Sequence, residues 1–252
     1  MTPFTIAAAQ SISVAGDLAT NIVRHQRFMQ VAAEQGVQLL VFPELSLTGY
    51  ERELAAGLAI VPGAEVLQPL RDFAREVGVT SVVGMPIRLS EASPVFIGAL
   101  VFGADGSLEV YSKQHLHPGE EVAFAPGTGG SMLTIGTDTV ALAVCADFSH
   151  ARHAASAAEQ GAALYAAGVL ITENGYAPDT ALLQGYANTH SMTVLMANHG
   201  GATGGWESAG RSAIWASDGS LIAAAPGTGN VMVVARREAG EWRGHIVDIP
   251  EA

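Results

Sequence analysis

The amino-acid sequence predicts an α/β protein in which a mixed β-sheet is covered by helices. In the first third of the chain, short runs rich in Val, Ile and Phe alternate with helical patterns, whereas paired apolar runs separated by turn signals follow later. Alternating strands and helices are typical of parallel pairing, and hairpins are typical of antiparallel pairing. No repeat, long charge run or low-complexity linker divides the chain, so we expect one domain over residues 1–252.

The first third of the chain is expected to contain three strands and two helices. Asp17 is a candidate cap for a helix that begins at Leu18 and stops at Gly36, and a second amphipathic helix is expected to stop at Gly78. The predicted strands cover residues 5–10, 37–42 and 79–84, and the second helix covers residues 64–77.

The remaining elements begin with two hairpins. Turn signals at residues 104–106 and 136–138 separate strands expected over 95–102 and 107–111, and over 132–135 and 139–144. Helices are then expected over 149–160 and near 179–191, with strands near Leu164 and over 193–197. Strands over 212–215, 221–225 and 231–235 are expected to close the chain as a meander.

The composition excludes several classes of protein. Twelve basic and twenty-four acidic residues give a net charge of −12, which argues against binding to nucleic acid or an anionic membrane surface. A single cysteine cannot form an internal disulfide or a cysteine-cluster metal site, and it fits a reducing compartment. The N-terminal residues do not resemble a signal peptide, and Gly, Asn, His and Gln interrupt the longest uncharged stretches, so we expect no membrane span. We therefore expect a cytoplasmic protein.

Three polar residues lie where predicted strands end, which is where layered α/β folds place their sites. Glu44 follows an apolar strand through Pro43, Lys113 follows Tyr111-Ser112, and Cys145 ends the strand over 139–144. A lone cysteine is often a small apolar core residue. A thiol at the start of a helix, in contrast, has a lowered pKa and lies near N–H groups that can stabilise an oxyanion. Position alone leaves both interpretations of Cys145 open.

Lys113 is the one lysine, whereas the other eleven basic residues are arginine. It is either a chance survivor of an Arg-biased composition or a compact ammonium required against an oxyanion or a carboxylate. Glu44 lies in an apolar stretch, where burial would raise its pKa toward the range of a general base. Glu120 and Glu121, taken alone, are expected to be solvated.

Histidines suggest two further hypotheses. Two pairs have spacings at which a strand or helix could present both rings to a metal, His115 with His117 and His150 with His153. No further ligand pattern completes either pair, so we expect no metal site. Spacing leaves open a Cys–His dyad of Cys145 with His190 or His199.

Three ordered blocks carry the candidate functional residues. They are Phe42-Pro-Glu44 with Leu47-Thr-Gly-Tyr50, then Tyr111-Ser-Lys113-Gln-His-Leu116, then Ala143-Val-Cys145-Ala-Asp147. In the order and spacing of Glu, Lys and Cys, the chain resembles the nitrilase superfamily of carbon–nitrogen hydrolases. The resemblance extends over nearly the whole chain and includes Ala8-Ala-Gln10 and Met196-Ala-Asn198.

The resemblance implies an α-β-β-α four-layer sandwich that pairs into a homodimer or a higher homo-oligomer. It also implies a catalytic triad of Glu44, Lys113 and Cys145, with Glu120 as an additional glutamate seven residues after the lysine. Cys145 would attack a carbonyl or nitrile carbon, Glu44 would move the proton, and Lys113 with the N–H of Ala146 would stabilise the oxyanion. This chemistry requires no metal or organic cofactor.

Departures from the family pattern bear on the substrate. Ala146 follows the cysteine where many amide-cleaving members carry Tyr or Phe, and Ser149 replaces an Arg that often binds a substrate carboxylate. Arg152 or His150 could take over that contact. The compact chain with Cys-Ala-Asp resembles amidases and carbamoylases more than nitrilases. The residues expected at the substrate are Ala146, Tyr50, His150 and Glu173, with Gly175, Tyr176 and Trp206 as neighbours.

The sequence therefore predicts a cysteine-dependent hydrolase that cleaves the C–N bond of a small linear amide or N-carbamoyl compound. A nitrilase that uses the same residues is the nearest alternative. Two alternatives come from other classes, namely a catalytically silent binding protein and an unrelated enzyme in which Lys113 forms a Schiff base.

Overall fold

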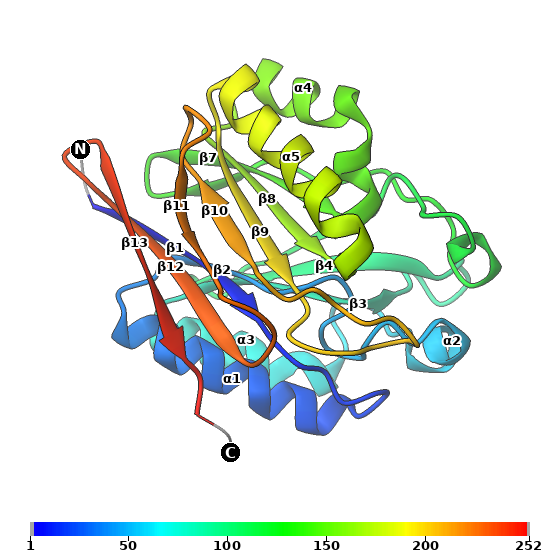
Figure 1. Ribbon diagram of the computed structural model, residues 1–252. Helices are drawn as coiled ribbons and strands as arrows, with labels where there is room; N and C mark the ends of the chain where they lie inside the picture. Colours follow the sequence, from blue (N-terminus) through cyan, green and yellow to red (C-terminus); the bar gives the residue numbers. More distant parts are fainter. Residues whose placement is uncertain (1–2, 251–252) are drawn as a thin grey trace.

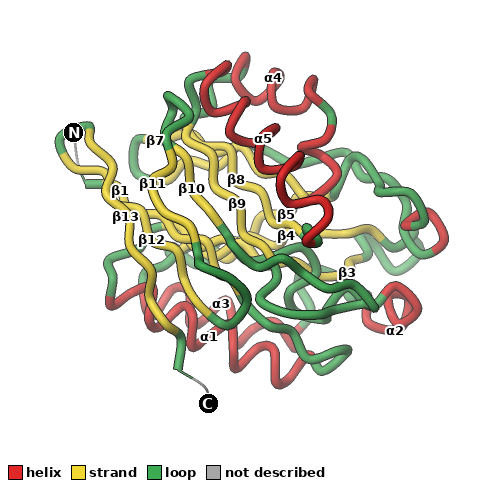
Figure 2. The backbone as a smooth tube through the Cα atoms, in the orientation of Figure 1, coloured by secondary structure: helices red, strands yellow, loops and turns green. Residues whose placement is uncertain are grey.

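The computed structural model describes residues 3–250, and its layers run helix, sheet, sheet, helix (Figure 1). Helices α1 (Leu18–Glu34) and α3 (Gln68–Val77) cover the outer face of one sheet. Helices α4 (Ala151–Glu159) and α5 (Glu173–His190) cover the outer face of the other, and the strands lie between the two helical layers (Figure 2). The predicted four-layer α-β-β-α sandwich is confirmed.

The larger sheet has seven strands in the order β13-β12-β1-β2-β3-β4-β5. β1 pairs in parallel with β2, and β2 with β3, whereas the other neighbouring strands pair antiparallel. Its strands are β1 (Phe4–Gln10), β2 (Leu39–Val41), β3 (Thr80–Ile87), β4 (Phe96–Phe102), β5 (Leu108–Ser112), β12 (Val231–Glu238) and β13 (Glu241–Asp248).

The smaller sheet has six strands in the order β11-β10-β9-β8-β7-β6. β7, β8 and β9 are parallel to one another, and the outer pairs are antiparallel. Its strands are β6 (Leu133–Ile135), β7 (Asp138–Val144), β8 (Leu164–Val169), β9 (Thr193–Asn198), β10 (Ala213–Trp215) and β11 (Leu221–Ala224).

Strand alternation distributes apolar side chains to three cores. On β1, Ile6 and Ala8 face the core between the sheets, whereas Ala7 and Ala9 pack in the core beneath α1 and α3. Residues two apart share a face of a strand, so one strand contributes to two cores. The core beneath α4 and α5 is rich in alanine, which permits a close approach of helix to sheet.

The helix termini follow the capping residues that the sequence indicates. The Asp17 side chain accepts a hydrogen bond from the N–H of Thr20 at 3.0 Å, which caps α1. Gly78 ends α3 with a φ of 70°, a left-handed conformation that glycine adopts without strain. One short helix, α2 (Ala55–Leu58), and four 3₁₀ segments complete the helices, namely η1 (Arg52–Leu54), η2 (Glu65–Leu67), η3 (Glu120–Val122) and η4 (Cys145–Ser149). Within residues 3–250, no helix is long and apolar enough to cross a membrane.

Several elements differ from the sequence prediction. The short helix α2 was not predicted, and η2 occupies the start of the helix expected over 64–77, so α3 begins at residue 68. β13 was not predicted, because it is an edge strand with mostly exposed side chains and lacks an apolar alternation. α5 begins at residue 173 rather than 179, since the helix accommodates Pro178 in its second turn. The helix expected over 149–160 is preceded by η4, so α4 itself begins at residue 151.

Candidate active site

Loops from both sheets meet at the carboxyl ends of their strands. Glu44 follows β2 and Lys113 follows β5 in the larger sheet, whereas Cys145 directly follows β7 in the smaller one. Glu44 and Cys145 line a cavity of about 280 Å³. A larger cavity of about 400 Å³, beside α4, is lined by none of these three residues. The smaller cavity is therefore the candidate active site.

Lys113 lies between two carboxylates. Its Nζ donates to Glu44 Oε1 at 2.7 Å and to both oxygens of Glu120 at 2.7 Å, and the three side chains are fully buried. A buried charge is tolerated only when it is paired and hydrogen-bonded, and here one ammonium serves two carboxylates. The expectation that Glu120 is solvated is therefore wrong, while Glu121 is exposed.

Glu120 is held from the protein side by two further donors. The hydroxyl of Tyr50 donates to Glu120 Oε1 at 2.6 Å, and the N–H of His117 donates to Oε2 at 2.7 Å. These bonds fix the carboxylate and, through it, the direction of the Lys113 ammonium. Glu44 Oε2, in contrast, is buried without a hydrogen-bond partner among the described residues.

Burial and mutual charge set the protonation states of the site. Burial raises the pKa of Glu44 to about 7, and the Lys113 ammonium opposes this rise. Burial and then the charge of Glu44 raise the pKa of the Cys145 thiol well above its ordinary value, against a lowering by Lys113. Burial lowers the pKa of Lys113, but Glu44, Cys145 and Glu120 together raise it above its ordinary value. The resting cysteine is thus a thiol beside a group that can take its proton.

The lowered thiol pKa that the sequence analysis associates with a helix N-terminus is not found. The segment that begins at Cys145 is the five-residue 3₁₀ segment η4, and burial outweighs any dipole it provides. Cys145 itself has a φ of 43°, in the left-handed region that non-glycine residues rarely adopt. This sharp turn exposes the end of β7 to the cavity.

The backbone of residues 42–45, which carries Glu44, packs closely against β3 and β8. Leu45 also has a positive φ, 52°. A Cβ on Gly84 would lie 2.3 Å from the Leu45 nitrogen, and a Cβ on Gly168 would lie 2.5 Å from the Phe42 carbonyl oxygen, so only glycine fits at either position. The Nε2 of buried His199 donates to the Glu44 carbonyl oxygen at 2.7 Å. Both sheets thereby position this glutamate.

Asp147 connects the cysteine turn to the lysine loop. Its carboxylate accepts from the N–H of Val144 at 3.1 Å and from the Tyr111 hydroxyl at 2.7 Å. It also accepts from the N–H groups of Gln114 and His115, at 3.0 and 2.9 Å, directly after Lys113. One buried carboxylate thus fixes the spacing between the nucleophile candidate and the ammonium.

The comparisons with known proteins agree with this geometry. The sequence profile of the family described as "Carbon-nitrogen hydrolase" matches residues 5–243. The chain belongs to the carbon-nitrogen hydrolase family.

The solved structures and curated relatives that this chain resembles include an amidase, a nitrilase and an omega-amidase. The amidase from Nesterenkonia sp. AN1, solved as a double mutant in complex with acrylamide, matches with a TM-score of 0.85 and 25% identity over 94% of this chain and 92% of that chain. The nitrilase from Pyrococcus abyssi is 32% identical over 147 residues, which are 56% of this chain and 55% of the nitrilase. The Homo sapiens omega-amidase is 28% identical over 174 residues, 65% of this chain and 62% of the relative. The chain thus spans less than two thirds of the length of these curated relatives.

The structure brings together six of the eight site residues expected from the sequence. Glu44, Tyr50, Cys145 and Ala146 line the cavity, and Lys113 and Glu120 lie directly behind Glu44 and Tyr50. The remaining two are His150 and Glu173.

His150 and Glu173 do not line the cavity. The ring of His150 stacks on His115 with centroids 3.8 Å apart, and the Glu173 carboxylate pairs with Arg211. Their own neighbours hold both side chains outside the cavity wall, so the geometry does not support a substrate contact. Tyr176 is likewise drawn away, since its hydroxyl donates to the Arg211 carbonyl oxygen.

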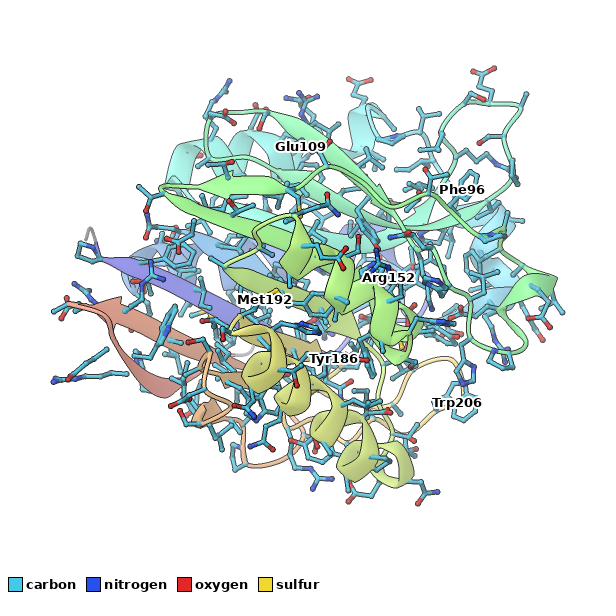
Figure 3. The ribbon with its side chains drawn as sticks, turned by 90° about the horizontal axis from the view of Figure 1, so that it is seen from above. Phe96, Glu109, Arg152, Tyr186, Met192 and Trp206 are labelled. Atoms are coloured by element: carbon cyan, nitrogen blue, oxygen red, sulfur yellow. The ribbon has the colours of Figure 1, made fainter. Side chains whose placement is uncertain are left out.

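Several residues of the cavity wall were missed or only partly anticipated. Gly175 and Trp206 line the cavity as expected, and Figure 3 shows Trp206 on a loop at the edge of the molecule. The residues that were not proposed as substrate contacts are Arg52, His117, Phe148, Ser149, Leu170, Ile171, Thr172 and Asp179. Asp179 could be found only with the helix start corrected to residue 173, because it then follows Gly175 by four residues and shares its helix face.

The histidine hypotheses find no counterpart at the cysteine. The Cys145 thiol donates to the Leu170 carbonyl oxygen at 3.7 Å, and the Nε2 of His199 donates to the Glu44 backbone. His190 lies at the far end of α5, in contact with the ring of Tyr186. Over residues 3–250, no three His, Cys, Asp or Glu side chains are grouped so that they could hold a metal ion.

Proposed function

We propose that this chain is a cysteine-dependent hydrolase that cleaves the C–N bond of a small linear amide or N-carbamoyl compound. The observation that carries the proposal is the buried Glu44–Lys113 ion pair beside Cys145 at one cavity. A base, an ammonium and a thiol are the three groups that acyl transfer through a thioester requires. Membership of the carbon-nitrogen hydrolase family supports the same reaction class.

In the acylation step, the Glu44 carboxylate takes the thiol proton as the Cys145 sulfur attacks the amide carbon. The oxyanion that forms is stabilised by the Lys113 ammonium and by the N–H of Ala146. Glu44 then gives the proton to the leaving nitrogen, the C–N bond breaks, and ammonia or an amine departs. The acyl group stays on sulfur as a thioester.

In the deacylation step, Glu44 takes a proton from water, and the resulting hydroxide attacks the thioester carbon. The tetrahedral intermediate collapses, the proton returns to the Cys145 sulfur, and the carboxylic acid leaves. The net reaction is amide plus water to carboxylic acid plus ammonia or amine. Glu120, held by Tyr50, keeps the ammonium of Lys113 in place during both steps.

The match to solved amidase structures favours an amide over a nitrile as the substrate. The Nesterenkonia amidase matches this chain over more than nine tenths of its length, and one of its structures shows the product of acrylamide addition to its active-site cysteine. In the sequence comparison, the omega-amidase matches 65% of the chain and the nitrilase 56%. Nitriles therefore belong in the substrate panel as the competing class.

The proposal is tested by ammonia release from a panel of short amides, N-carbamoyl compounds and nitriles, combined with intact-protein mass spectrometry. We expect turnover of amides and a transient mass increase equal to the acyl group, both absent in Cys145→Ala. The expected acyl mass maps to the peptide that contains Cys145. Turnover that survives in Cys145→Ala, or an adduct trapped on Lys113 by borohydride, would overturn the mechanism.

We also propose that the chain acts in a reducing compartment as a homodimer. A single cysteine used as nucleophile must stay reduced, which a reducing compartment ensures. The outer faces of α4 and α5 are the expected contact, and Leu182 on α5 is exposed there. Light scattering at micromolar concentration distinguishes a dimer of twice the chain mass from a monomer.

A further inference from the structure

Asp179 contributes a carboxylate to the wall of the candidate active site. It lies on α5, one turn after Gly175, and both residues line the same cavity as Cys145. Asp179 is half-buried, and no hydrogen bond or ion pair with residues 3–250 contributes to its pKa. The mechanism proposed above does not use this group.

Glycine at position 175 provides the space in which this carboxylate lies. A Cβ on Gly175 would be 3.1 Å from Asp179 Oδ2, closer than side-chain contacts normally permit. The carboxylate therefore packs against the first turn of α5, at the cavity wall. Burial raises the pKa of Asp179, and the charge of His117 opposes this rise. A partly desolvated carboxylate in this position lacks a positive partner.

The rest of the cavity suits a short apolar chain. Ala146, Phe148, Leu170 and Ile171 contribute apolar surface, and the volume of about 280 Å³ is at the lower end for a small-molecule site. A substrate that fills this space brings its end distal to the amide against the wall.

Two basic side chains at the cavity donate to backbone carbonyl groups. The Arg52 guanidinium donates to the Gly119 carbonyl oxygen at 3.2 Å and lies 5.9 Å from the ring centre of Tyr50. His117 is exposed, and its Nδ1 donates to the Pro118 carbonyl oxygen at 3.0 Å. Both side chains therefore have a protein acceptor, whereas no residue within 3–250 donates a hydrogen bond to the Asp179 carboxylate.

The charge of the whole chain favours a cationic substrate. Twenty-four acidic and twelve basic residues give a net charge of −12, and the single lysine is buried in the ion pair with Glu44. Such a field concentrates cations at the surface and repels carboxylates. The Asp179 carboxylate and the net charge of the chain therefore both attract cations.

We propose that Asp179 is a specificity-determining residue that binds an ammonium group at the end of the substrate distal to the scissile amide. The preferred substrates are then short ω-amino amides. This inference rests on the proposed amide hydrolysis and names the substrate class of that same site.

The test compares amides that differ only by replacement of a terminal methyl group with an ammonium. The pairs are 3-aminopropanamide with butanamide, and 5-aminopentanamide with hexanamide. We expect the unaltered chain to prefer one amino amide by about tenfold or more in kcat/KM. Asp179→Asn should reduce that preference by about 10-fold to 100-fold, mainly through KM, because a hydrogen bond to a charged group is lost. The readout is the ratio of kcat/KM for the amino amide to kcat/KM for its neutral partner, taken within each protein.

Glu159→Gln is the matched control. It removes one carboxylate from the same helical layer, but Glu159 pairs with Arg152 on exposed α4 and does not line the cavity. The preference for the amino amide should be unchanged in this variant. A similar loss in both variants would mean that the overall field, and not a contact with Asp179, selects the cation, which would overturn the inference.

The two proposals fail in distinguishable ways. If neutral amides are hydrolysed but the preference is absent, or is unaffected by Asp179→Asn, the subsite is wrong and the amidase proposal stands. If no amide is hydrolysed, the amidase proposal fails. Calorimetry of 3-aminopropanamide and 5-aminopentanamide with Cys145→Ala then decides the subsite. Affinity that falls about tenfold or more on adding Asp179→Asn supports it, and equal affinity overturns it.

Discussion

Glu44 is the residue whose protonation should govern the rate. Its pKa is raised to about 7 by burial, and it must be ionised to accept the thiol proton. We therefore predict that kcat/KM for a neutral amide rises with pH through an apparent pKa near 7 and falls about tenfold per pH unit below pH 6. Measuring kcat/KM from pH 5 to 9 tests this prediction. A rising limb only above pH 9 would indicate instead that free thiolate formation controls the reaction.

Glu44→Gln is the matched variant for this profile, since it keeps the shape of the side chain and removes the titration. We expect activity to fall by about 10³-fold, within the range that a general base contributes, and the limb near pH 7 to disappear. Ammonia release at several pH values gives both results. A variant that keeps the limb would assign it to another group.

Lys113 should dominate stability as well as chemistry. Lys113→Met would leave Glu44 and Glu120 buried without a counter-charge, and removing one partner of a buried pair costs about 3–5 kcal/mol. Without the opposing ammonium, burial would raise the pKa of Glu44 further, so the folded state retains a proton that the unfolded state loses as the pH rises. The deficit should be large at pH 8 and smaller at pH 5, as measured by urea unfolding. Adding Glu120→Gln should recover part of the loss at pH 8. A deficit independent of pH would point to packing alone.

Residue type and position at strand ends made Glu44, Lys113 and Cys145 candidates, because each follows a predicted strand, and the family resemblance then grouped them as a triad. The environment of Glu120 could not be read in the same way. Its neighbours in sequence are polar or glycine, and only the distant Lys113 and Tyr50 make its burial favourable. The cavity wall was also hard to predict, since Leu170, Asp179 and Trp206 come from three segments that only the fold brings together.

At the scale of elements, Gly84 on β3 should be indispensable to the site. A Cβ there would lie 2.3 Å from the Leu45 nitrogen and 2.6 Å from the Pro43 carbonyl oxygen, so the segment that carries Glu44 must shift. We predict that Gly84→Ala costs about 1–3 kcal/mol in the free energy of unfolding and lowers kcat by at least about 100-fold. Denaturant titration and amide turnover measure the two effects.

Gly57→Ala is the control for the same chemical change. A Cβ on Gly57 meets nothing within 4 Å in exposed helix α2, so alanine should be neutral or stabilising by up to about 1 kcal/mol, with activity unchanged. Equal effects of the two substitutions would show that the close packing of Gly84 against residues 43–45 does not position Glu44.

Helices and strands were predicted correctly where their own sequence carries a strong pattern. β1 and β3 are buried throughout, and β7 is buried at every position except Thr139. These strands have mainly apolar sequences, and Asp17 caps α1. β13 is defined instead by eight register positions with β12, from Val231 opposite Asp248 to Glu238 opposite Glu241. Backbone pairing of this kind leaves no apolar signature when the strand lies at an edge.

At the scale of the whole molecule, the two sheets must keep their relative position, because one provides Glu44 and Lys113 and the other provides Cys145. Arg237 on β12 donates to both oxygens of Asp138 on β7, at 2.9 and 2.7 Å, and thereby joins the sheets. Its guanidinium also lies over the rings of Phe4 and Trp242. Asp138 begins β7 and Cys145 follows its end, so about 20 Å separates this bridge from the nucleophile.

This separation predicts a loss of stability without a loss of chemistry. Arg237→Met should lower the free energy of unfolding by about 2–4 kcal/mol, because Asp138 is left largely buried without its partner, while kcat at 25 °C stays within about twofold. Adding Asp138→Asn should restore part of the stability, since no unpaired charge then remains between the sheets. Denaturant unfolding and turnover on the same preparations decide the outcome. If Arg237→Met instead lowers kcat as strongly as Gly84→Ala, the ion pair with Asp138 also positions the active-site residues, and the prediction is wrong.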